Sequence, residues 1–167
     1  MSLLRLKLDR IPLYQFHRPD PDVPVEDSIG TLVELKEQGK IRHLGVSNMT
    51  EDELRQAQRL TPIVSIQNRY NLSDRRSEPL VDLCEQEQLV FLPWAPIQNL
   101  EGNPSVGDAA AKYGVTPYQV VLAWLLARSP SILPIPGTGS VGHLDENVAA
   151  AGLQLTPAEV AAISGLG

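Results

Sequence analysis

The chain has 167 residues and a net charge of −6; 43% of its residues are hydrophobic and 20% are charged. This length suits one domain with a sizeable core, and the composition is that of a globular protein rather than a disordered one. The negative charge disfavours a nucleic-acid partner, because phosphate binding depends on clustered Lys and Arg.

No run approaches the ~20 apolar residues that a membrane-spanning helix needs, so we expect no membrane partner. The first residues also lack the apolar stretch of a signal peptide. The single cysteine, Cys84, cannot form an internal disulfide, and it falls in a helical pattern where a small core residue is expected. Together these features predict a soluble cytoplasmic protein.

Five short apolar runs, each closed by polar or turn residues, predict β-strands. They lie at residues 10–17, 41–47, 63–67, 89–94 and 131–135. Their length and their content of β-branched residues favour strands over buried helical turns.

Amphipathic stretches with start and stop signals separate these runs and predict helices. Helices are expected at about 26–38, from Thr50, from Ser73 to about Glu87, in a short stretch ending near Gly114, at 116–127, at about 143–151 and from Thr156. Strands and helices thus alternate, and parallel strands need crossover helices whereas antiparallel ones can be joined by two residues. The pattern therefore predicts a parallel α/β protein with a single domain over residues 1–167.

The position of the glycines and of the polar strand ends favours a barrel over an open sheet. An open dinucleotide-binding sheet normally carries Gly-x-Gly-x-x-Gly after its first strand, whereas here the glycines of segment 136–140 follow the last predicted strand. Polar residues also stand at or just beyond the carboxyl ends of strands, where a barrel holds its active site. They are His17, Ser47, Asn48, Gln67 and Thr138.

A series of motifs in a fixed order resembles the aldo-keto reductase family. The motifs are Leu13-Tyr-Gln-Phe-His-Arg-Pro19, Gly39-Lys-Ile-Arg-His-Leu-Gly-Val-Ser-Asn48, Ile66-Gln-Asn68, Pro93-Trp-Ala-Pro96 and Leu133-Pro-Ile-Pro-Gly-Thr138 with Glu146-Asn147. The resemblance runs from the family's fourth strand to its C-terminus. It implies a partial (β/α)8 TIM-type barrel with five parallel strands, strands 4 to 8, and flanking helices.

The resemblance also implies NADP(H)-dependent reduction of aldehydes and ketones, and the reverse oxidation of alcohols, with a small-molecule carbonyl compound as substrate. The family's catalytic tetrad is an Asp, a Tyr, a Lys and a His, and His17 matches the last of these. The other three belong to strand-helix units with no counterpart here, so we expect the chain to be inactive alone. The alternative is a non-catalytic nucleotide-binding or scaffold protein with the same fold.

The same resemblance assigns residues to the cofactor. Ser47, Asn48 and Gln67 would hold the nicotinamide carboxamide, although Ser-Asn is also common where a chain simply turns. Trp94 would stack on nicotinamide, its alternative role being a core aromatic. The phosphates would bind at Pro136, Gly137 and Thr138, with His143, Glu146 and Asn147 on the adenosine side. The alternative for Glu146 and Asn147 is an exposed helix face without a ligand.

Two further expectations concern the cofactor and the assembly. Many relatives carry Lys and Arg at the positions of Gly137 and His143, where these cations hold the adenosine 2′-phosphate. This chain has neither, so NADP(H) is implied only by the resemblance, NAD(H) is not excluded, and no metal is expected. An incomplete barrel has open sheet edges and would uncover interior side chains such as Ile66, Phe91 and Ile135. We therefore expect a homo-oligomer or association with a missing N-terminal half.

Overall fold

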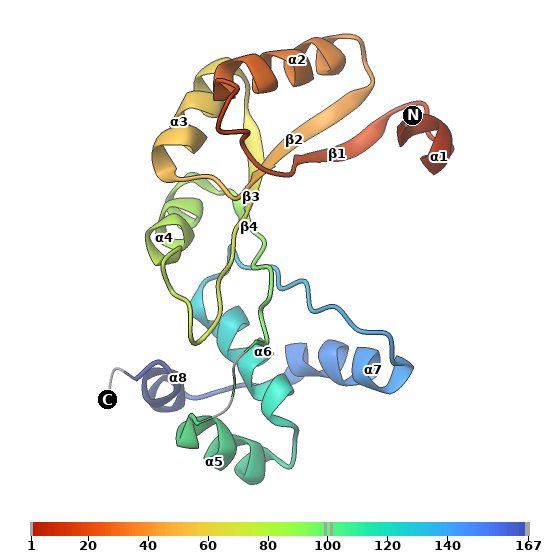
Figure 1. The fold of residues 1–167 in the computed structure, drawn as a ribbon. Coiled ribbons are helices and arrows are strands. Elements are labelled where there is room, and N and C mark those ends of the chain that lie inside the picture. The colour runs from red at the N-terminus through yellow and green to blue at the C-terminus, as the bar shows by residue number, and fades with distance from the viewer. Residues whose placement is uncertain (1, 99, 101, 166–167) are drawn as a thin grey trace.

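The computed structural model describes residues 2–98, 100 and 102–165, and Figure 1 shows their arrangement. The elements are, in chain order, α1 (Ser2–Leu6), β1 (Ile11–Phe16), α2 (Val25–Glu37), β2 (Ile41–Ser47), α3 (Glu51–Leu60), β3 (Ile63–Gln67), α4 (Glu78–Glu87), β4 (Val90–Phe91), α5 (Pro104–Tyr113), α6 (Pro117–Arg128), α7 (Val141–Ala149), the 3-10 helix η1 (Ala150–Gly152) and α8 (Pro157–Ile163). Strands alternate with helices through β4, and helices follow one another after it.

The sheet contains four parallel strands in the order β1-β2-β3-β4. The expectation of five strands, strands 4 to 8 of a barrel, is wrong for the described residues, because the segment predicted as the fifth makes a single bridge, Phe91 to Ile132. Phe91 N donates to Ser131 O at 2.8 Å, and Leu133 N donates to Phe91 O at 2.9 Å. Beyond these bonds, the nitrogens of Pro134 and Pro136 have no hydrogen to donate to a ladder.

Prolines also mark the outer sides of the sheet. Ile11 N donates to Lys40 O at 2.9 Å on the β2 side. Since successive residues of a parallel strand bond to opposite sides, the nitrogen of Pro12 faces away from β2. On the other side Leu133 N donates to Phe91 O, and the next residue, Pro134, has no N–H to offer a further strand. Both outer sides therefore lack some of the donors that a new strand would need.

The helix termini follow the sequence signals closely. Thr50 and Thr116 each form the expected capping box, with Glu53 and Gln119 respectively. α4 begins later than predicted from Ser73, since the Oδ1 atom of Asn71 accepts hydrogen bonds from the backbone N of Ser73 at 3.0 Å and of Asp74 at 2.8 Å. These bonds hold residues 71–74 in a turn instead of a first helical turn.

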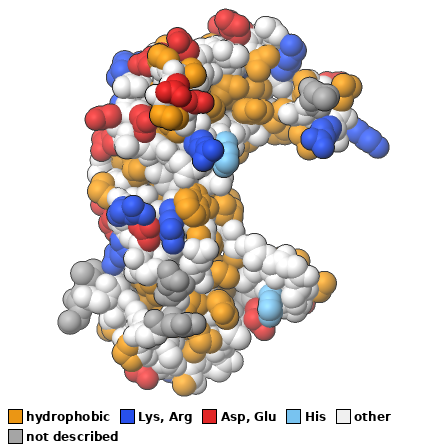
Figure 2. Space-filling view, in the orientation of Figure 1, with side chains coloured by type: hydrophobic (Ala, Val, Ile, Leu, Met, Phe, Trp, Pro, Cys, Tyr) orange, Lys and Arg blue, Asp and Glu red, His pale blue; other side chains and the backbone are white. Residues whose placement is uncertain are grey.

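Helices α2, α3 and α4 lie along one side of the sheet (Figure 1), and the apolar strand residues are buried on that side. Ile66 and Phe91 are both fully buried, so the expectation that they would be uncovered is wrong. The opposite, concave side carries Gln15, Gly45 and Ser65 in adjacent strands. Figure 2 shows the crescent outline of the molecule and its open hollow.

Tyr70 joins the sheet to the C-terminal helices. Its ring stacks on Trp124 of α6 at 6.0 Å and meets Phe91 edge-on at 5.8 Å. Its hydroxyl donates to Glu78 Oε2 at 2.7 Å, and that carboxylate also pairs with Arg75 and Arg128. Burial together with the bond to Glu78 raises the pKa of the Tyr70 hydroxyl. The Tyr70 hydroxyl therefore stays neutral at ordinary pH, and its ring and hydroxyl link the sheet to the C-terminal helices.

None of the helices in the described part of the chain combines the length and the apolar character required to cross a membrane. Cys84 is a free, buried residue of α4, in agreement with a core role, and burial raises the pKa of its thiol to about 12.

Candidate functional site

Asn48 is the centre of a hydrogen-bonded group at the carboxyl ends of the strands. It has a left-handed backbone, with φ 56°, directly after β2, a conformation that Asn tolerates better than most residues. Its Nδ2 donates to His17 O at 3.0 Å and to Ser47 Oγ at 3.1 Å, and its Oδ1 accepts from Trp94 Nε1 at 2.9 Å. One amide thus links the segments that follow three strands.

Ser47 and Gln67 lie beneath this amide. The Ser47 hydroxyl donates to Gln67 O at 2.6 Å, and its residue is only 1% exposed. Asn48 N donates to the same carbonyl at 3.1 Å. Ser47 is therefore a buried hydrogen-bond acceptor for the Asn48 amide, whereas Gln67 and Asn48 are themselves more exposed.

Trp94 is held on two sides. Its backbone N donates to Asn68 O at 3.1 Å, and Trp94 forms a single parallel β-bridge with Arg69. The Arg69 guanidinium lies over the indole, with Cζ 5.5 Å from the ring centroid, within the range of a cation–π interaction. Sequence reasoning assigned Arg69 no role, because nothing in the order of residues shows which ring it covers.

His17 follows β1 and is exposed, and its backbone carbonyl is fixed by Asn48. The structure therefore brings His17, Ser47, Asn48, Gln67 and Trp94 into one group, here called the strand-end group. An exposed imidazole next to fixed amides can donate a hydrogen bond to a bound molecule or accept one from it.

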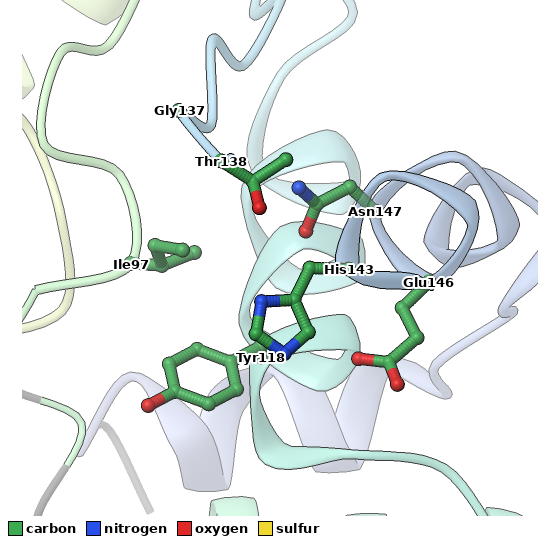
Figure 3. A pocket seen from close by; sticks show the side chains of 7 residues that line it. All are labelled: Ile97, Tyr118, Gly137, Thr138, His143, Glu146 and Asn147. Atoms are coloured by element: carbon green, nitrogen blue, oxygen red, sulfur yellow. The ribbon is translucent and has the colours of Figure 1, made fainter. Parts of the chain in front are cut away.

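The remaining predicted residues lie around the start of α7. A pocket of about 250 Å³ is lined by Ile97, Tyr118, Gly137, Thr138, His143, Glu146 and Asn147 (Figure 3). In Figure 3 the His143 ring occupies the middle, with Tyr118 on one side and Glu146 on the other. Ser140 caps the helix by accepting from His143 N at 3.4 Å, and the Thr138 hydroxyl accepts from Ser140 N at 3.1 Å.

This α7 pocket contains five of the six predicted phosphate and adenosine residues. Pro136 lines a neighbouring apolar groove of about 400 Å³ instead, and Asn147 borders both. Ile97 and Tyr118 were missed, because Tyr118 stands inside a helix-capping motif and Ile97 in a loop without any recognisable pattern. Among the seven described lining side chains, His143 alone can carry a positive charge.

No ligand group for a metal was found among the described residues. There, no three His, Cys, Asp or Glu side chains lie together in a way that could hold an ion. The chemistry that this arrangement offers is hydrogen bonding by amides, hydroxyls and imidazoles.

Comparison with known proteins places the chain in a family. The model of the Aldo/keto reductase family matches residues 1–102 and 98–167, which span the whole chain. The chain belongs to the aldo/keto reductase family.

Its relatives are longer than the chain. An uncharacterized oxidoreductase of Schizosaccharomyces pombe is 43% identical over 159 residues, a match covering 93% of this chain and 52% of that protein. Pyridoxine 4-dehydrogenase of Escherichia coli is 38% identical over 144 residues, covering 85% of this chain and 50% of that protein. The chain thus spans about half the length of the curated relatives that it matches.

Solved structures share the fold over nearly the whole chain. A thermostable aldo-keto reductase in complex with the inhibitor epalrestat superimposes with a TM-score of 0.92 at 34% identity, covering 99% of this chain and 63% of that chain. An aldo-keto reductase from Klebsiella pneumoniae in complex with NADPH gives a TM-score of 0.85 at 29% identity, covering 99% and 61%. The chain is therefore a fragment of the family fold.

Proposed function

We propose that this chain is the cofactor-binding, C-terminal portion of an aldo-keto-reductase-type oxidoreductase that uses NADP(H) to reduce a small carbonyl compound or to oxidise the alcohol. The observation that carries the proposal is the connection between the strand-end group and the α7 pocket. Trp94 donates to Asn48 within the strand-end group. Ile97, three residues further along the same segment, lines the α7 pocket. A dinucleotide has two ends, which suit two linked sites.

The donor set at each site fits the corresponding end of the cofactor. A nicotinamide carboxamide has one acceptor and two donors. Both N–H groups of Asn48 are already engaged, but its Oδ1 has a second lone pair that can accept from a ligand donor, and the side-chain amide of Gln67 can donate to the ligand acceptor. At the α7 pocket, a Cβ added to Gly137 would meet nothing within 4 Å, so a ligand group can approach its backbone. The N-terminus of α7 adds the partial positive charge that favours a phosphate.

When bound, the cofactor supplies the hydride. The role that we assign to this chain's residues is to bind and orient. The imidazole of His17 would donate an N–H to the substrate oxygen as negative charge develops on it. The bond from Asn48 Nδ2 to the His17 carbonyl fixes the end of β1 beside the nicotinamide site.

We further propose that the lone chain binds cofactor without turnover, since His17 is its only match to the family's catalytic tetrad. The test combines the purified chain with NADPH and an aldehyde, measuring NADPH binding by calorimetry and its oxidation by the loss of nicotinamide absorbance. Binding without oxidation is expected.

Turnover by the lone chain would contradict its inactivity, and a lack of binding would contradict the cofactor role. Binding that never leads to turnover, even in cell extract, would favour the alternative of a non-catalytic nucleotide-binding protein.

An assembly is proposed from the exposed apolar residues around the groove. Leu133, Leu144 and Val148 are 56%, 51% and 67% exposed, and all three line the groove of about 400 Å³ between α6 and α7. Covering them would remove apolar area from water. We expect a homo-oligomer, most simply a two-fold dimer, or a complex with a missing N-terminal half. Sedimentation showing a compact monomer at micromolar concentration would contradict the dimer, and Val148→Asp should weaken it.

A cytoplasmic location is also proposed. It is supported by the single free thiol of Cys84, which suits a reducing compartment. Fractionation of cells that express the protein would test it.

A further inference from the structure

We propose that Arg69 is a positioning residue, which holds Trp94 and, through it, the side-chain amide of Asn48 in the orientation that receives nicotinamide. The identity of the ligand rests on the proposed function. The coupling between the three side chains does not, because it is a property of the free protein.

Arg69 is fixed at three points around its guanidinium. Nη2 donates to Gln98 Oε1 at 3.2 Å, and Nε lies 3.4 Å from Asp74 Oδ2 in an ion pair. Nε is buried and has no hydrogen-bond partner, since the geometry of this pair is not that of a hydrogen bond. Hydrogen bonds from Arg76 hold the pKa of the Asp74 carboxyl at about 2, so the anion opposite Arg69 persists through the neutral range.

The third point is the face of Trp94. A cation over an indole is attracted by the ring quadrupole, and it draws electron density toward itself. That shift makes Nε1–H a better donor, which strengthens the 2.9 Å bond to Asn48 Oδ1. Arg69 therefore both restricts the rotation of the ring and improves the hydrogen bond that the ring makes.

The Trp94 indole and the His17 carbonyl together fix which way the Asn48 amide points. With Oδ1 toward Trp94, Nδ2 faces the carbonyl of His17 and the hydroxyl of Ser47. A flipped amide would place a donor against the indole N–H and an acceptor against the His17 carbonyl, both of which are repulsive. One of the two contacts that orient the Asn48 amide therefore comes from a ring whose position depends on Arg69.

The test uses the full chain and the variant Arg69→Met, which keeps an apolar side chain against the indole and removes the cation. The chain has two tryptophans, so its ¹H–¹⁵N spectrum contains two indole signals, which Trp124→Phe assigns. In Arg69→Met, the Trp94 indole signal and the Asn48 side-chain amide signals should move. The dissociation constant for NADP⁺ should rise about two- to fivefold, as expected for loss of one cation–π contact. Arg69→Lys, which keeps a charge, should recover part of the affinity.

Arg75→Met provides a matched control. Arg75 covers Trp124 at the same 5.5 Å, and the Trp124 Nε1 donates to Ser164 Oγ at 2.9 Å. This change should move the Trp124 signal and leave NADP⁺ affinity unaltered. If it unfolds the chain, the Trp124 signal within Arg69→Met serves as the internal reference.

Two results would overturn the proposal. The first is that the Trp94 and Asn48 signals stay in place in Arg69→Met. The second is that they move while NADP⁺ binds as tightly as before. If the wild-type chain binds no NADP⁺, the proposed function fails, and the spectra of the free protein still decide whether Arg69 holds Trp94 and Asn48.

Discussion

Gly45 of β2 lies directly against the side-chain amide of Gln15 in β1. A Cβ added to Gly45 would be 2.1 Å from Gln15 Oε1 and 2.2 Å from Ser65 Oγ. The space is taken because Gln15 Nε2 donates to Val46 O at 2.7 Å, while Gln15 Oε1 accepts from Ser65 Oγ at 3.1 Å. The concave side of three strands is thus joined by one polar bridge that only glycine accommodates.

Gly45→Ala should therefore displace Gln15 and break both of its hydrogen bonds. We expect the free energy of unfolding, measured by urea titration, to fall by about 1–3 kcal/mol. In a Gln15→Ala background the same change should cost clearly less, because the amide is gone and the Ser65 hydroxyl, no longer bonded to it, can rotate away. Equal costs in the two backgrounds would show that the contact is not the cause.

Asn48 combines an unusual backbone with three side-chain hydrogen bonds, and two substitutions separate these contributions. Asn48→Gly removes the bonds and retains the left-handed conformation, whereas Asn48→Ala also adds a strain of about 1–2 kcal/mol. We expect Asn48→Ala to be less stable than Asn48→Gly by that amount in thermal unfolding. Both should weaken NADP⁺ binding to a similar extent, and a difference in binding without one in stability would contradict this separation.

His143→Arg should increase the preference for NADPH over NADH. An arginine is charged at all working pH values and binds phosphate through two parallel hydrogen bonds, which an imidazole cannot form because its two ring nitrogens point in different directions. We expect the ratio of the two dissociation constants to change about tenfold, as for one charge-assisted contact. Isothermal calorimetry with each cofactor measures this. His143→Gln is the control and should leave the ratio near that of the wild type; an arginine variant that behaves like it would remove His143 from the adenosine side.

Glu159 should make the stability of the chain depend on pH in the acid range. Hydrogen bonds from Lys112 at 2.6 Å, and from the backbone and side chain of Thr156, lower the pKa of Glu159 to about 2. A carboxyl with a lowered pKa in the folded state stabilises it above the unfolded pKa, near 4.5, and this contribution is lost as the pH falls toward 2.

Glu159→Gln is the matched variant, since a glutamine can still complete the capping box with Thr156 while lacking the ion pair. The urea midpoint of the wild type should exceed that of the variant at pH 6, and the two should converge toward pH 2. A gap that stays constant with pH would exclude the ion pair as its cause. The 3.3 Å bond from Glu159 N to Thr156 Oγ1 should persist in both proteins.

The sequence predicts helix starts and most strands well, because these depend on local chemistry. The capping boxes at Thr50 and Thr116 and the strands at 41–47 and 63–67 are formed as predicted. The segment 131–135 fails because a strand also needs a neighbour. Its neighbour β4 contains just Val90 and Phe91, and its own prolines cannot donate.

The sequence predicts which residues belong to the candidate site better than it predicts which way their side chains point. Alternation along a strand assigns residues to two faces, but it does not say which face the helices cover, so Ile66 and Phe91 were assigned to the wrong one. Ser47 was expected to face the cofactor, and the structure places its hydroxyl underneath Asn48. The contributions of Arg69 and Tyr118 depend on contacts between distant segments, which no local pattern encodes.

The outward-facing prolines at the two sides of the sheet have a consequence for behaviour at high concentration. A strand edge can act as a template on which further copies add to form fibres, and it needs an uninterrupted row of N–H donors to do so. Pro12 on one side and Pro134 on the other each remove one donor from that row. A further strand that paired with either side would therefore leave some of its carbonyls without a donor, which disfavours growth of the sheet into filaments.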